Sequence, residues 1–584
     1  MKIQCLIGNS VSFLIGGEAG QGITRSGSLL GKAVMKGGFQ VFGMNDYPSV
    51  IRGGHNLYLL RASDGEVHSQ DDKIDLLLSL NEDTMIKHYR ELNEGGGIIY
   101  DSKPEKGDRT SDRPDLGLYP VPLTQFVEEI GGNPIMRNTV AIGAALALVG
   151  YKLELLQEAI AEAFPGRDKI IEENQKAAEK GYNYTMENYG GSFLCSMEPY
   201  DERVDRIMLT GSESIALGAV QAGCKFFSAY PMTPASPILH YLINHDEALG
   251  IVVIQPESEI SAINMVIGAS YAGVRAMTAT SGGGLALMTE SLGLAALTET
   301  PIVIVVGQRP GPSTGMATYS SQGDLLFTIH ASHGEFPRVV VAPGDVEESY
   351  RLTGEAFNLA ERYQIPVLIL TDKYLLESHK SAEHFKPLAI DRGSLHTGSE
   401  WTEGEYMRHR ITPSGVSPRV IPGTKGAFTL SNSNEHDEYG HSTIDPETIE
   451  AMTGKIRRKE ENLRKEVFSL NPVKVYGQDD AEVTIICWGS TKGPGLEALQ
   501  ILEDSGYSAR LVQVVYIEPF PVDALVEALK GRDKLLLVEG NKTGQLGKLI
   551  KLHTGINPSN IYLRYDGRPF NPGDIARRAM EVNH

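Results

Sequence analysis

The chain has 584 residues and a formal net charge of −20, from 74 acidic and 54 basic residues. This balance argues against nucleic acid and anionic membrane surfaces as partners, because both bind proteins through basic patches. A hydrophobic share of 41% and a charged share of 22% are normal for a globular protein, and the length suggests three or four domains. We expect a metabolic enzyme of the cytoplasm.

The cysteines predict neither a disulfide framework nor a metal site. Only four occur, and no two have the CxxC spacing: Cys5, Cys195, Cys224 and Cys487. We therefore predict four reduced thiols, and no zinc or iron–sulfur site made by this chain. Asn9 and Ser10 break the first apolar segment, so we expect a strand there rather than a signal peptide. No window is apolar over the length of a membrane span.

The first 185 residues have the pattern of an α/β unit. An apolar run at 11–17 enters the glycine turn GGEAGQG (16–22), and a helical pattern follows at 26–38. Further apolar runs predict two buried parallel strands and then a packed helix, at 74–80, 96–102 and 139–150. The polar segment 186–204 is predicted to be a linker.

The glycine turn is similar to a phosphate-binding loop. Gly17, Gly20 and Gly22 let backbone N–H groups approach an anion at a helix start. The turn is neither GxGxxG nor a Walker motif. A tight strand-to-helix turn that binds no ligand is an equal alternative.

Two more units of the same kind follow. The second begins near Arg206 with strand, glycine loop, helix and strand over 206–230. Strands at 251–255, 275–282, 301–308 and 366–372 then alternate with helices at 260–273 and 284–298. Residues 386–470 are an irregular excursion ending in a charged helix at 447–467, and the last unit has strands at 482–489, 509–517 and 533–541. We predict an α/β fold of three doubly wound units.

The loops that follow the strands of the second unit are the candidate site, because ligands of α/β proteins bind at the carboxyl ends of strands. In AYPMTPAS (229–236), Pro231 and Pro234 stiffen the backbone around Thr233 and beside Tyr230. Thr233 would then offer a fixed hydroxyl to a substrate. A loop that binds nothing is the alternative.

Two acids, Glu257 and Glu259, lie where the next strand enters a helix. A carboxyl in that position is either a helix cap or an acid placed for chemistry. Gly282 and Gly283 follow another strand and would let the backbone approach a ligand closely.

The loop GQRPGPSTGMATYSSQGDL (307–325) supplies Arg309 together with the hydroxyls of Ser313 and Thr314. An arginine there can hold a carboxylate in a bidentate fork. The alternative is an arginine whose N–H groups are satisfied by loop carbonyls.

Together, and in this order, these motifs resemble the α subunit of 2-oxoacid:ferredoxin oxidoreductases. The similarity extends to SPRVIPG (417–423), EHDEYGH (435–441), WGS (488–490) and EGNKTGQL (539–546). The elements GGEAGQG and YPSVIRGGHN (47–56) are similar to the family's γ subunit, which is fused ahead of α in many members. The resemblance covers nearly the whole chain.

The resemblance implies five segments. They are a γ-type domain at 1–185, the linker at 186–204, a thiamine-diphosphate pyrimidine-binding domain at 205–385, the excursion at 386–470 and a transketolase C-terminal-like domain at 471–584. It also implies oxidative decarboxylation of a 2-oxoacid, with thiamine diphosphate as cofactor, coenzyme A as co-substrate and ferredoxin as electron acceptor.

A β subunit is the implied partner. This chain has no GDG pattern for Mg²⁺ and no cysteine set for a cluster. The β subunit is therefore expected to bring the diphosphate and Mg²⁺ site and a [4Fe–4S] cluster, in an (αβ)₂ assembly, and we expect no metal ligands here.

The resemblance also implies roles for individual residues. Glu259 would contact N1′ of the aminopyrimidine, with Gly282 and Gly283 beside the cofactor. Substrate would be bound by Thr233 as a catalytic residue and by its neighbours, which are Tyr230, Pro231, Arg309, Ser313 and Thr314. The glycine turn with Arg52 is a possible loop for coenzyme A or phosphate.

Some relatives carry a basic residue where this chain has Tyr319. The residue that binds the substrate carboxylate and the preferred 2-oxoacid therefore stay open, with 2-oxoglutarate first and pyruvate or a broad range second. The direction of the reaction also stays open. The alternatives are a nucleotide-binding dehydrogenase built on the glycine turn and a non-catalytic scaffold chain of the same fold.

Overall fold

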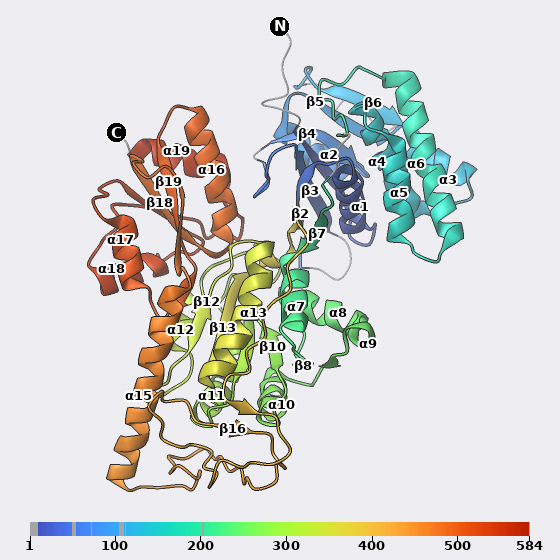
Figure 1. The fold of residues 1–584 in the computed structure, drawn as a ribbon. Helices are drawn as coiled ribbons and strands as arrows, with labels where there is room; N and C mark the ends of the chain where they lie inside the picture. The colour runs from blue at the N-terminus through green and yellow to red at the C-terminus, as the bar shows by residue number, and fades with distance from the viewer. Residues whose placement is uncertain are drawn as a thin grey trace. The chain divides into compact units, whose positions relative to one another are not determined.

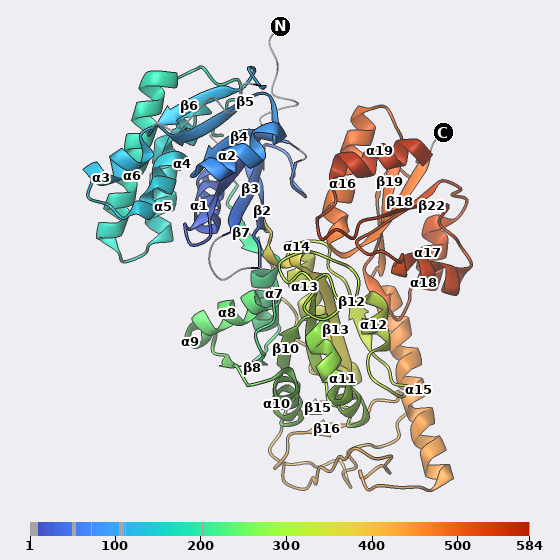
Figure 2. The same ribbon diagram turned by 180° about the vertical axis from the view of Figure 1, so that it is seen from behind.

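A computed structural model of the chain describes residues 10–49, 54–71, 73–103, 110, 112–200 and 204–582. The chain forms two compact units, which Figure 1 shows from the front and Figure 2 from behind. The N-terminal unit runs to Leu209 and includes Ser378–His384, and the C-terminal unit comprises Thr210–Glu377 and Phe385–His584. No helix within the described ranges combines the length and the apolar character needed to cross a bilayer.

The N-terminal unit is built on a mixed sheet in the order β6-β5-β4-β1-β3-β2-β14-β7. In chain order the strands are β1 (Val11–Glu18), β2 (Gln40–Asp46), β3 (His55–Ser63), β4 (Ile74–Ser79), β5 (Leu92–Asp101), β6 (Gly117–Val121), β7 (Ile207–Thr210) and β14 (His379–Ala382). The run β1, β4, β5, β6 is parallel, which confirms the parallel strands predicted at 74–80 and 96–102, whereas β3 pairs antiparallel with both β1 and β2.

Two strands of this sheet come from sequence far from the rest of the unit. The strand at the start of the predicted second unit is present as β7, but it lies in the N-terminal sheet beside β14. Strand β14 pairs antiparallel with β2, and the Ser381 hydroxyl accepts a hydrogen bond from the Val41 N–H at 2.9 Å. The prediction that β7 opens the second sheet is therefore wrong. Short edge strands can join either of two sheets, and tertiary pairing decides between them.

The helices of this unit are α1 (Ile23–Lys36), α2 (Glu82–His88), α3 (Leu123–Glu129), α4 (Arg137–Leu148), α5 (Leu153–Ala163) and α6 (Asp168–Tyr189). Helix α4 is the packed helix expected at 139–150. It crosses α6 at Gly143, where an added Cβ would lie 2.1 Å from the Ala178 carbonyl oxygen, so the backbones touch. Helix α6 runs to Tyr189, into the segment expected as a linker.

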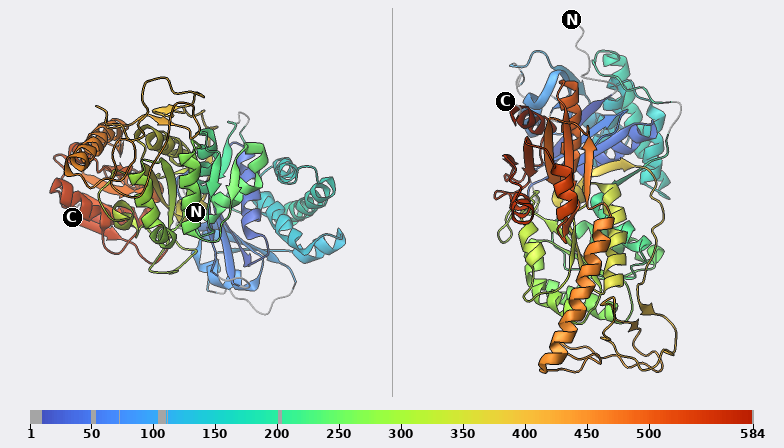
Figure 3. Two further views of the ribbon diagram at one scale, coloured as in Figure 1. Left: turned by 90° about the horizontal axis from the view of Figure 1, so that it is seen from below. Right: turned by 60° about the vertical axis from the view of Figure 1, so that its left-hand side comes forward.

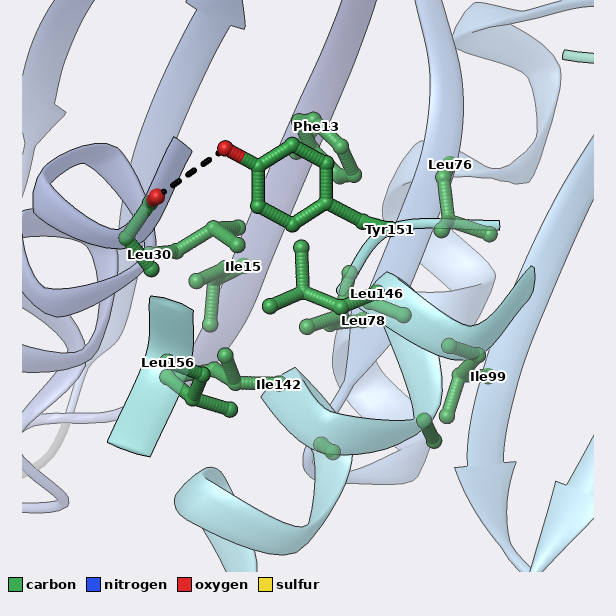
Figure 4. Close-up of a cluster of buried hydrophobic side chains, with 14 of the residues drawn as sticks. Phe13, Ile15, Leu30, Leu76, Leu78, Ile99, Ile142, Leu146, Tyr151 and Leu156 are labelled. Carbon is green, nitrogen blue, oxygen red and sulfur yellow. Dashed lines mark hydrogen bonds between the residues drawn. The ribbon is translucent and has the colours of Figure 1, made fainter. Parts of the chain in front are cut away.

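The core of the N-terminal unit is continuous from the sheet to these helices. Figure 4 shows Tyr151 among apolar side chains of β1, α1 and α4, including Phe13, Leu30 and Leu146. The Tyr151 hydroxyl donates to the Val34 carbonyl at 2.8 Å, so the one polar atom of this buried ring has a partner.

The cysteines differ from expectation at one position. Cys224 and Cys487 are free and buried. Cys195 is disulfide-bonded, so the prediction of four reduced thiols is wrong. Cys5 lies outside the described residues.

The C-terminal unit contains a seven-stranded sheet in the order β20-β12-β13-β11-β10-β8-β9, parallel except for β20. Its strands are β8 (Phe226–Ser228), β9 (Val252–Ile254), β10 (Ala276–Thr280), β11 (Ile302–Gln308), β12 (Val339–Val341), β13 (Pro366–Asp372) and β20 (Tyr516–Glu518). The helices between them are α7 (Gly211–Gln221), α8 (Ser236–Asn244), α9 (Asp246–Leu249), α10 (Glu259–Tyr271), α11 (Gly282–Leu297), α12 (Leu325–His330), α13 (Val346–Tyr363) and α14 (Lys373–Glu377).

A second, five-stranded sheet in the same unit has the order β17-β19-β18-β21-β22. Its strands are β17 (Val473–Gly477), β18 (Val483–Trp488), β19 (Ala509–Val514), β21 (Leu535–Glu539) and β22 (Asn560–Leu563), and its helices are α16 (Lys492–Asp504), α17 (Val522–Leu529), α18 (Gln545–Thr554) and α19 (Pro572–Val582). The predicted run 509–517 divides between the two sheets, because β20 leaves this one and pairs with β12.

The excursion between the two sheets is mostly irregular and has only the short strands β15 (Leu395–His396) and β16 (Arg419–Val420). It leads into α15 (Pro446–Ser469), which Figure 3 shows as one unbroken helix. A buried charge cluster anchors it. The Glu299 carboxylate accepts from Lys455 Nζ at 2.5 Å and from Lys459 Nζ. Burial by itself raises a carboxyl pKa, but the two ammonium groups hold that of Glu299 well below its usual range.

Candidate active site

The candidate residues lie on loops at one edge of the seven-stranded sheet. Strands β8, β10, β11 and β13 are parallel, so their carboxyl ends meet at the same edge. Thr233 follows β8, Glu259 follows β9, Gly282 follows β10 and Arg309 follows β11. Residues spread over 77 positions of sequence are thus brought to this edge of the sheet. We call the edge and its loops, which carry Thr233, Glu259, Gly282 and Arg309, the rim.

Glu259 is a buried acid at the first position of α10. Ser258 caps the helix, since its hydroxyl accepts from the Ser261 N–H at 3.2 Å, and this fixes the point where the helix begins. The Glu259 side chain is only 4% exposed, and its Oε1 atom has no hydrogen-bond partner among the described residues. The cap is therefore Ser258, which leaves the Glu259 carboxyl available for another partner.

The first turn of α11 lies against this carboxyl. A Cβ on Gly284 would fall 3.0 Å from Glu259 Oε1 and 1.9 Å from Thr280 Oγ1, so only glycine fits there without displacement. Gly283 has no atom near its would-be Cβ and is exposed. The backbone at the start of α11 is therefore accessible at Gly283, whereas at Gly284 it packs directly against the Glu259 side chain.

Several polar atoms at this rim are buried without a partner in the described part of the chain. They are Glu259 Oε1 and the hydroxyls of Thr278, Thr280 and Ser281. Buried polar groups in proteins are nearly always hydrogen-bonded, so this cluster offers partners to a polar ligand or to water. Donors and acceptors of this kind fit the heteroaromatic nitrogens of an aminopyrimidine.

Glu257 differs from Glu259 in exposure and in hydrogen bonding. It is exposed, and its carboxylate accepts from the Ser261 hydroxyl at 2.5 Å. That hydrogen bond lowers the pKa of the Glu257 carboxyl. Glu257 therefore stabilises the local turn.

Arg309 connects two of the predicted loops. Its Nη1 donates to the Thr233 carbonyl oxygen at 2.7 Å. Burial lowers its pKa, against the attraction of Asp324. One N–H thus serves a loop carbonyl, as in the alternative interpretation above, and this bond also holds the Thr233 loop in place.

Asp324 was missed in the sequence. Its carboxylate lies against Gly282, where an added Cβ would be 2.3 Å from Oδ2. Burial raises the pKa of Asp324 to about 6, while the Arg309 guanidinium opposes that shift. The available signal was an acid directly before the helix that starts at Leu325, in the loop noted above only for its arginine, hydroxyls and glycines.

The other predicted substrate residues are more open. Tyr230 is 38% exposed, Pro231 is half-buried, and Ser313 and Thr314 are exposed. Ser313 has a φ of 57°, in a turn where Met316 N–H donates to the Pro310 carbonyl at 3.0 Å. By comparison Glu259 is buried, and Arg309 and Asp324 are partly buried.

The glycine turn of the N-terminal unit is a tight turn into α1. Gly20 and Gly22 have φ of 89° and 75°, which disfavours side chains there. The Glu18 N–H donates to the Gln21 side-chain oxygen at 3.0 Å, and an added Cβ on Gly17 would lie 2.5 Å from that oxygen. Arg52 lies outside the described residues.

Comparison with known proteins decides the family. Three family models match: pyruvate ferredoxin/flavodoxin oxidoreductase over residues 12–184, the thiamine-diphosphate-binding model of pyruvate flavodoxin/ferredoxin oxidoreductase over 217–455, and pyruvate:ferredoxin oxidoreductase core domain II over 481–575. The 2-oxoacid:ferredoxin oxidoreductase subunit alpha of Sulfolobus sp is 33% identical, with 98% of this chain and 97% of that protein covered. The chain belongs to the 2-oxoacid:ferredoxin oxidoreductase family.

Other members of the 2-oxoacid:ferredoxin oxidoreductase family match in sequence and structure. The 2-oxoglutarate synthase subunit KorA of Methanocaldococcus jannaschii is 34% identical over 57% of this chain and 88% of that protein. The 2-oxoglutarate:ferredoxin oxidoreductase of Magnetococcus marinus, solved with 2-oxoglutarate, coenzyme A and succinyl-CoA bound, superposes with a TM-score of 0.91 at 32% identity, covering 99% of this chain and 100% of that one.

These matches confirm the predicted family, the α/β fold class and the assignment as an oxidoreductase subunit. Across the residues that the structure describes, no group of three or more His, Cys, Asp or Glu side chains is placed to hold a metal ion. The predicted domain boundaries and site residues stay predictions.

Proposed function

We propose that this chain is the α subunit, with a fused γ-type domain, of an enzyme that converts a 2-oxoacid and coenzyme A to an acyl-CoA and CO₂. 2-Oxoglutarate is the first candidate substrate, and pyruvate or a broad range of 2-oxoacids comes second. The C1–C2 bond of the oxoacid breaks and a thioester bond forms. Two electrons pass to ferredoxin and the thiol proton is released, so the reaction balances.

The observation that carries this proposal is the buried, unpartnered carboxyl of Glu259 beside Gly284. We propose that Glu259 holds a proton at N1′ of the aminopyrimidine of thiamine diphosphate, with Gly282 and Gly283 against the cofactor. When bound, thiamine diphosphate supplies the carbon nucleophile and electron sink for decarboxylation. Because Glu259 is buried, water is kept away from this hydrogen bond, and a hydrogen bond is stronger in such a low-dielectric environment.

We propose that Arg309 binds the 1-carboxylate of the substrate. Its fork of N–H groups retains donors beyond the one given to Thr233, and the Asp324 carboxylate attracts its positive charge. The Thr233 hydroxyl then lies on a loop fixed by Arg309 and serves the oxo group. Tyr230 and Pro231 shape that loop, and Ser313 and Thr314 border its entrance.

The remaining parts of the reaction are assigned to partners and to the N-terminal unit. We propose that a β subunit provides the diphosphate and Mg²⁺ site and the [4Fe–4S] cluster, in an (αβ)₂ assembly in the cytoplasm. Gly17, Gly20 and Gly22, with Arg52, are proposed to bind a phosphate of coenzyme A, because a glycine-lined helix start offers backbone N–H groups to an anion.

The test compares Glu259→Gln with Glu257→Gln in the complex with its β subunit. Both changes remove one carboxylate from the same strand-to-helix turn, but only Glu259 is buried without a partner. Viologen reduction dependent on 2-oxoacid and coenzyme A is expected to fall by about 10²–10⁴-fold in Glu259→Gln and by less than about threefold in Glu257→Gln. Size-exclusion chromatography should show both variants assembled.

Equal activity of the two variants would remove Glu259 from the mechanism. A wild-type complex that oxidises none of the 2-oxoacids in a screen of 2-oxoglutarate, pyruvate and branched-chain 2-oxoacids would favour the scaffold interpretation. Binding of NAD(H) by the purified chain would favour the dehydrogenase interpretation.

A further inference from the structure

A small pocket lies in the C-terminal unit, between the loop that follows β11 and the loop that follows β22. Its volume is about 20 Å³, which accommodates the end of a ligand but not a whole one. The lining includes the hydroxyls of Ser320, Ser490 and Thr491 and the side chains of Arg564 and Arg568. The Ser320 and Ser490 hydroxyls donate to the Asp372 carboxylate and the Thr491 hydroxyl donates to Gln322 Oε1, so the positive groups of the lining are the two arginines.

The charge of this lining is positive, although the chain as a whole is strongly acidic. No acidic residue is among the described residues that line it. Asp566 neutralises part of Arg564 through Nε at 3.1 Å, but Arg564 Nη1 is buried with no partner in the described chain. A buried guanidinium N–H without an acceptor is costly, so an anionic oxygen is the complement that this wall lacks.

Arg568 reaches the candidate active-site loop directly. Its guanidinium carbon lies 4.3 Å from the centre of the Tyr319 ring, a cation–π contact. The Ser320 N–H donates to the Gly567 carbonyl at 3.1 Å, and an added Cβ on Gly567 would lie 2.9 Å from Tyr319 Cβ. The two loops therefore pack together without a gap.

The same loop continues into the rim described above. Tyr319 lies between Arg309, which we assign to the 1-carboxylate, and Asp324, which lies against Gly282. The Arg568 guanidinium therefore contacts the same loop that contains the proposed substrate residues. Arg568, from the segment after β22, thus contacts the same loop that carries Arg309 ten residues before Tyr319 in the sequence.

We propose that Arg568, supported by Arg564, binds the second carboxylate of a dicarboxylic 2-oxoacid, with Tyr319 as the aromatic platform that orients the guanidinium. This inference rests on the proposed function and names its substrate class. Two guanidinium groups match a carboxylate, which accepts several charge-assisted hydrogen bonds at once. A phosphate of coenzyme A has the same chemistry, and the experiment separates the two sources.

The experiment measures KM values of the αβ complex for 2-oxoglutarate, pyruvate and coenzyme A. Arg568→Gln is expected to raise KM for 2-oxoglutarate by about 10–100-fold, as loss of a charge-assisted hydrogen bond implies. KM for pyruvate, which has no second carboxylate, and KM for coenzyme A should change less than about twofold. Arg568→Lys should recover part of the loss, because it retains the charge but not the fork.

Arg578→Gln is the matched control. Arg578 lies over the Tyr562 ring at 5.8 Å and pairs with Glu581 at 2.8 Å, on α19 rather than in the pocket. It should leave all three KM values unchanged. Equal rises for both 2-oxoacids, or no rise for 2-oxoglutarate, would overturn the proposal. A rise confined to coenzyme A would assign the pocket to a phosphate instead.

A binding measurement tests the pocket independently of whether the proposed function is correct. Glutarate, which has two carboxylates and no oxo group, is titrated calorimetrically into the wild-type complex and into Arg568→Gln. Weaker binding to the variant supports the pocket even if the complex oxidises no 2-oxoacid. Equal binding to both proteins, or none to the wild type, contradicts it.

Discussion

Gly284→Ala tests whether close packing of α11 positions the Glu259 carboxyl. The added methyl would lie 1.9 Å from Thr280 Oγ1 and 2.9 Å from Glu259 Cγ, where roughly 3.5 Å is needed. Either Thr280 rotates or the Glu259 side chain retreats by about an ångström. Such a displacement of an activating group costs on the order of 100-fold in turnover.

Stability should respond less than activity. Overpacking costs about 1–3 kcal/mol, whereas alanine is better than glycine in a helix by about 1 kcal/mol, so the net loss is about 0–2 kcal/mol. Gly268→Ala is the control, because Gly268 lies within α10 with no atom close to its would-be Cβ. It should raise stability by about 0.5–1 kcal/mol.

Both variants are assayed by 2-oxoacid-dependent viologen reduction in the complex and by thermal unfolding. The reasoning is refuted if Gly284→Ala retains wild-type turnover while melting like Gly268→Ala. A loss of turnover that merely follows a large loss of folded protein would also contradict it, since the predicted effect on stability is small.

Two further predictions concern the buried charges. Glu299→Gln leaves the ammonium groups of Lys455 and Lys459 buried without their counter-ion and should cost about 3–5 kcal/mol. Urea unfolding followed by tryptophan fluorescence measures this, because both tryptophans lie in the C-terminal unit, and an unchanged midpoint would contradict it. Since the folded pKa of Asp324 is about 6, above its usual 3.8, its protonation favours folding at low pH and that contribution is lost as the pH rises through 6. Asp324→Asn should therefore have nearly the wild-type free energy of unfolding near pH 4 and a free energy of unfolding about 3 kcal/mol higher at pH 7, and an equal free energy of unfolding of the two proteins at both pH values would count against the shift.

The elements of the site could be predicted locally, but their contacts could not. Apolar runs and glycine turns placed the strands and the loops that carry Thr233, Glu259 and Arg309, because periodicity and backbone freedom are local properties. The family resemblance singled out Glu259 over Glu257, but the physical difference between them needed the structure, since burial and the Ser261 hydrogen bond depend on how α10 packs. Asp324 became a candidate only once its carboxylate was found against Gly282.

The sequence by itself determined the family, the α/β class and the rim on which the candidate residues lie. It did so because motif order, strand periodicity and the carboxyl-end rule require no knowledge of distant contacts. Only the tertiary structure decided that β7 and β14 complete the N-terminal sheet, that Cys195 is disulfide-bonded, and that Arg568 lies over Tyr319. The strand pairings and the contact between Arg568 and Tyr319 join segments far apart in the chain, and such pairings are selected by the packing of the whole fold rather than by local preference.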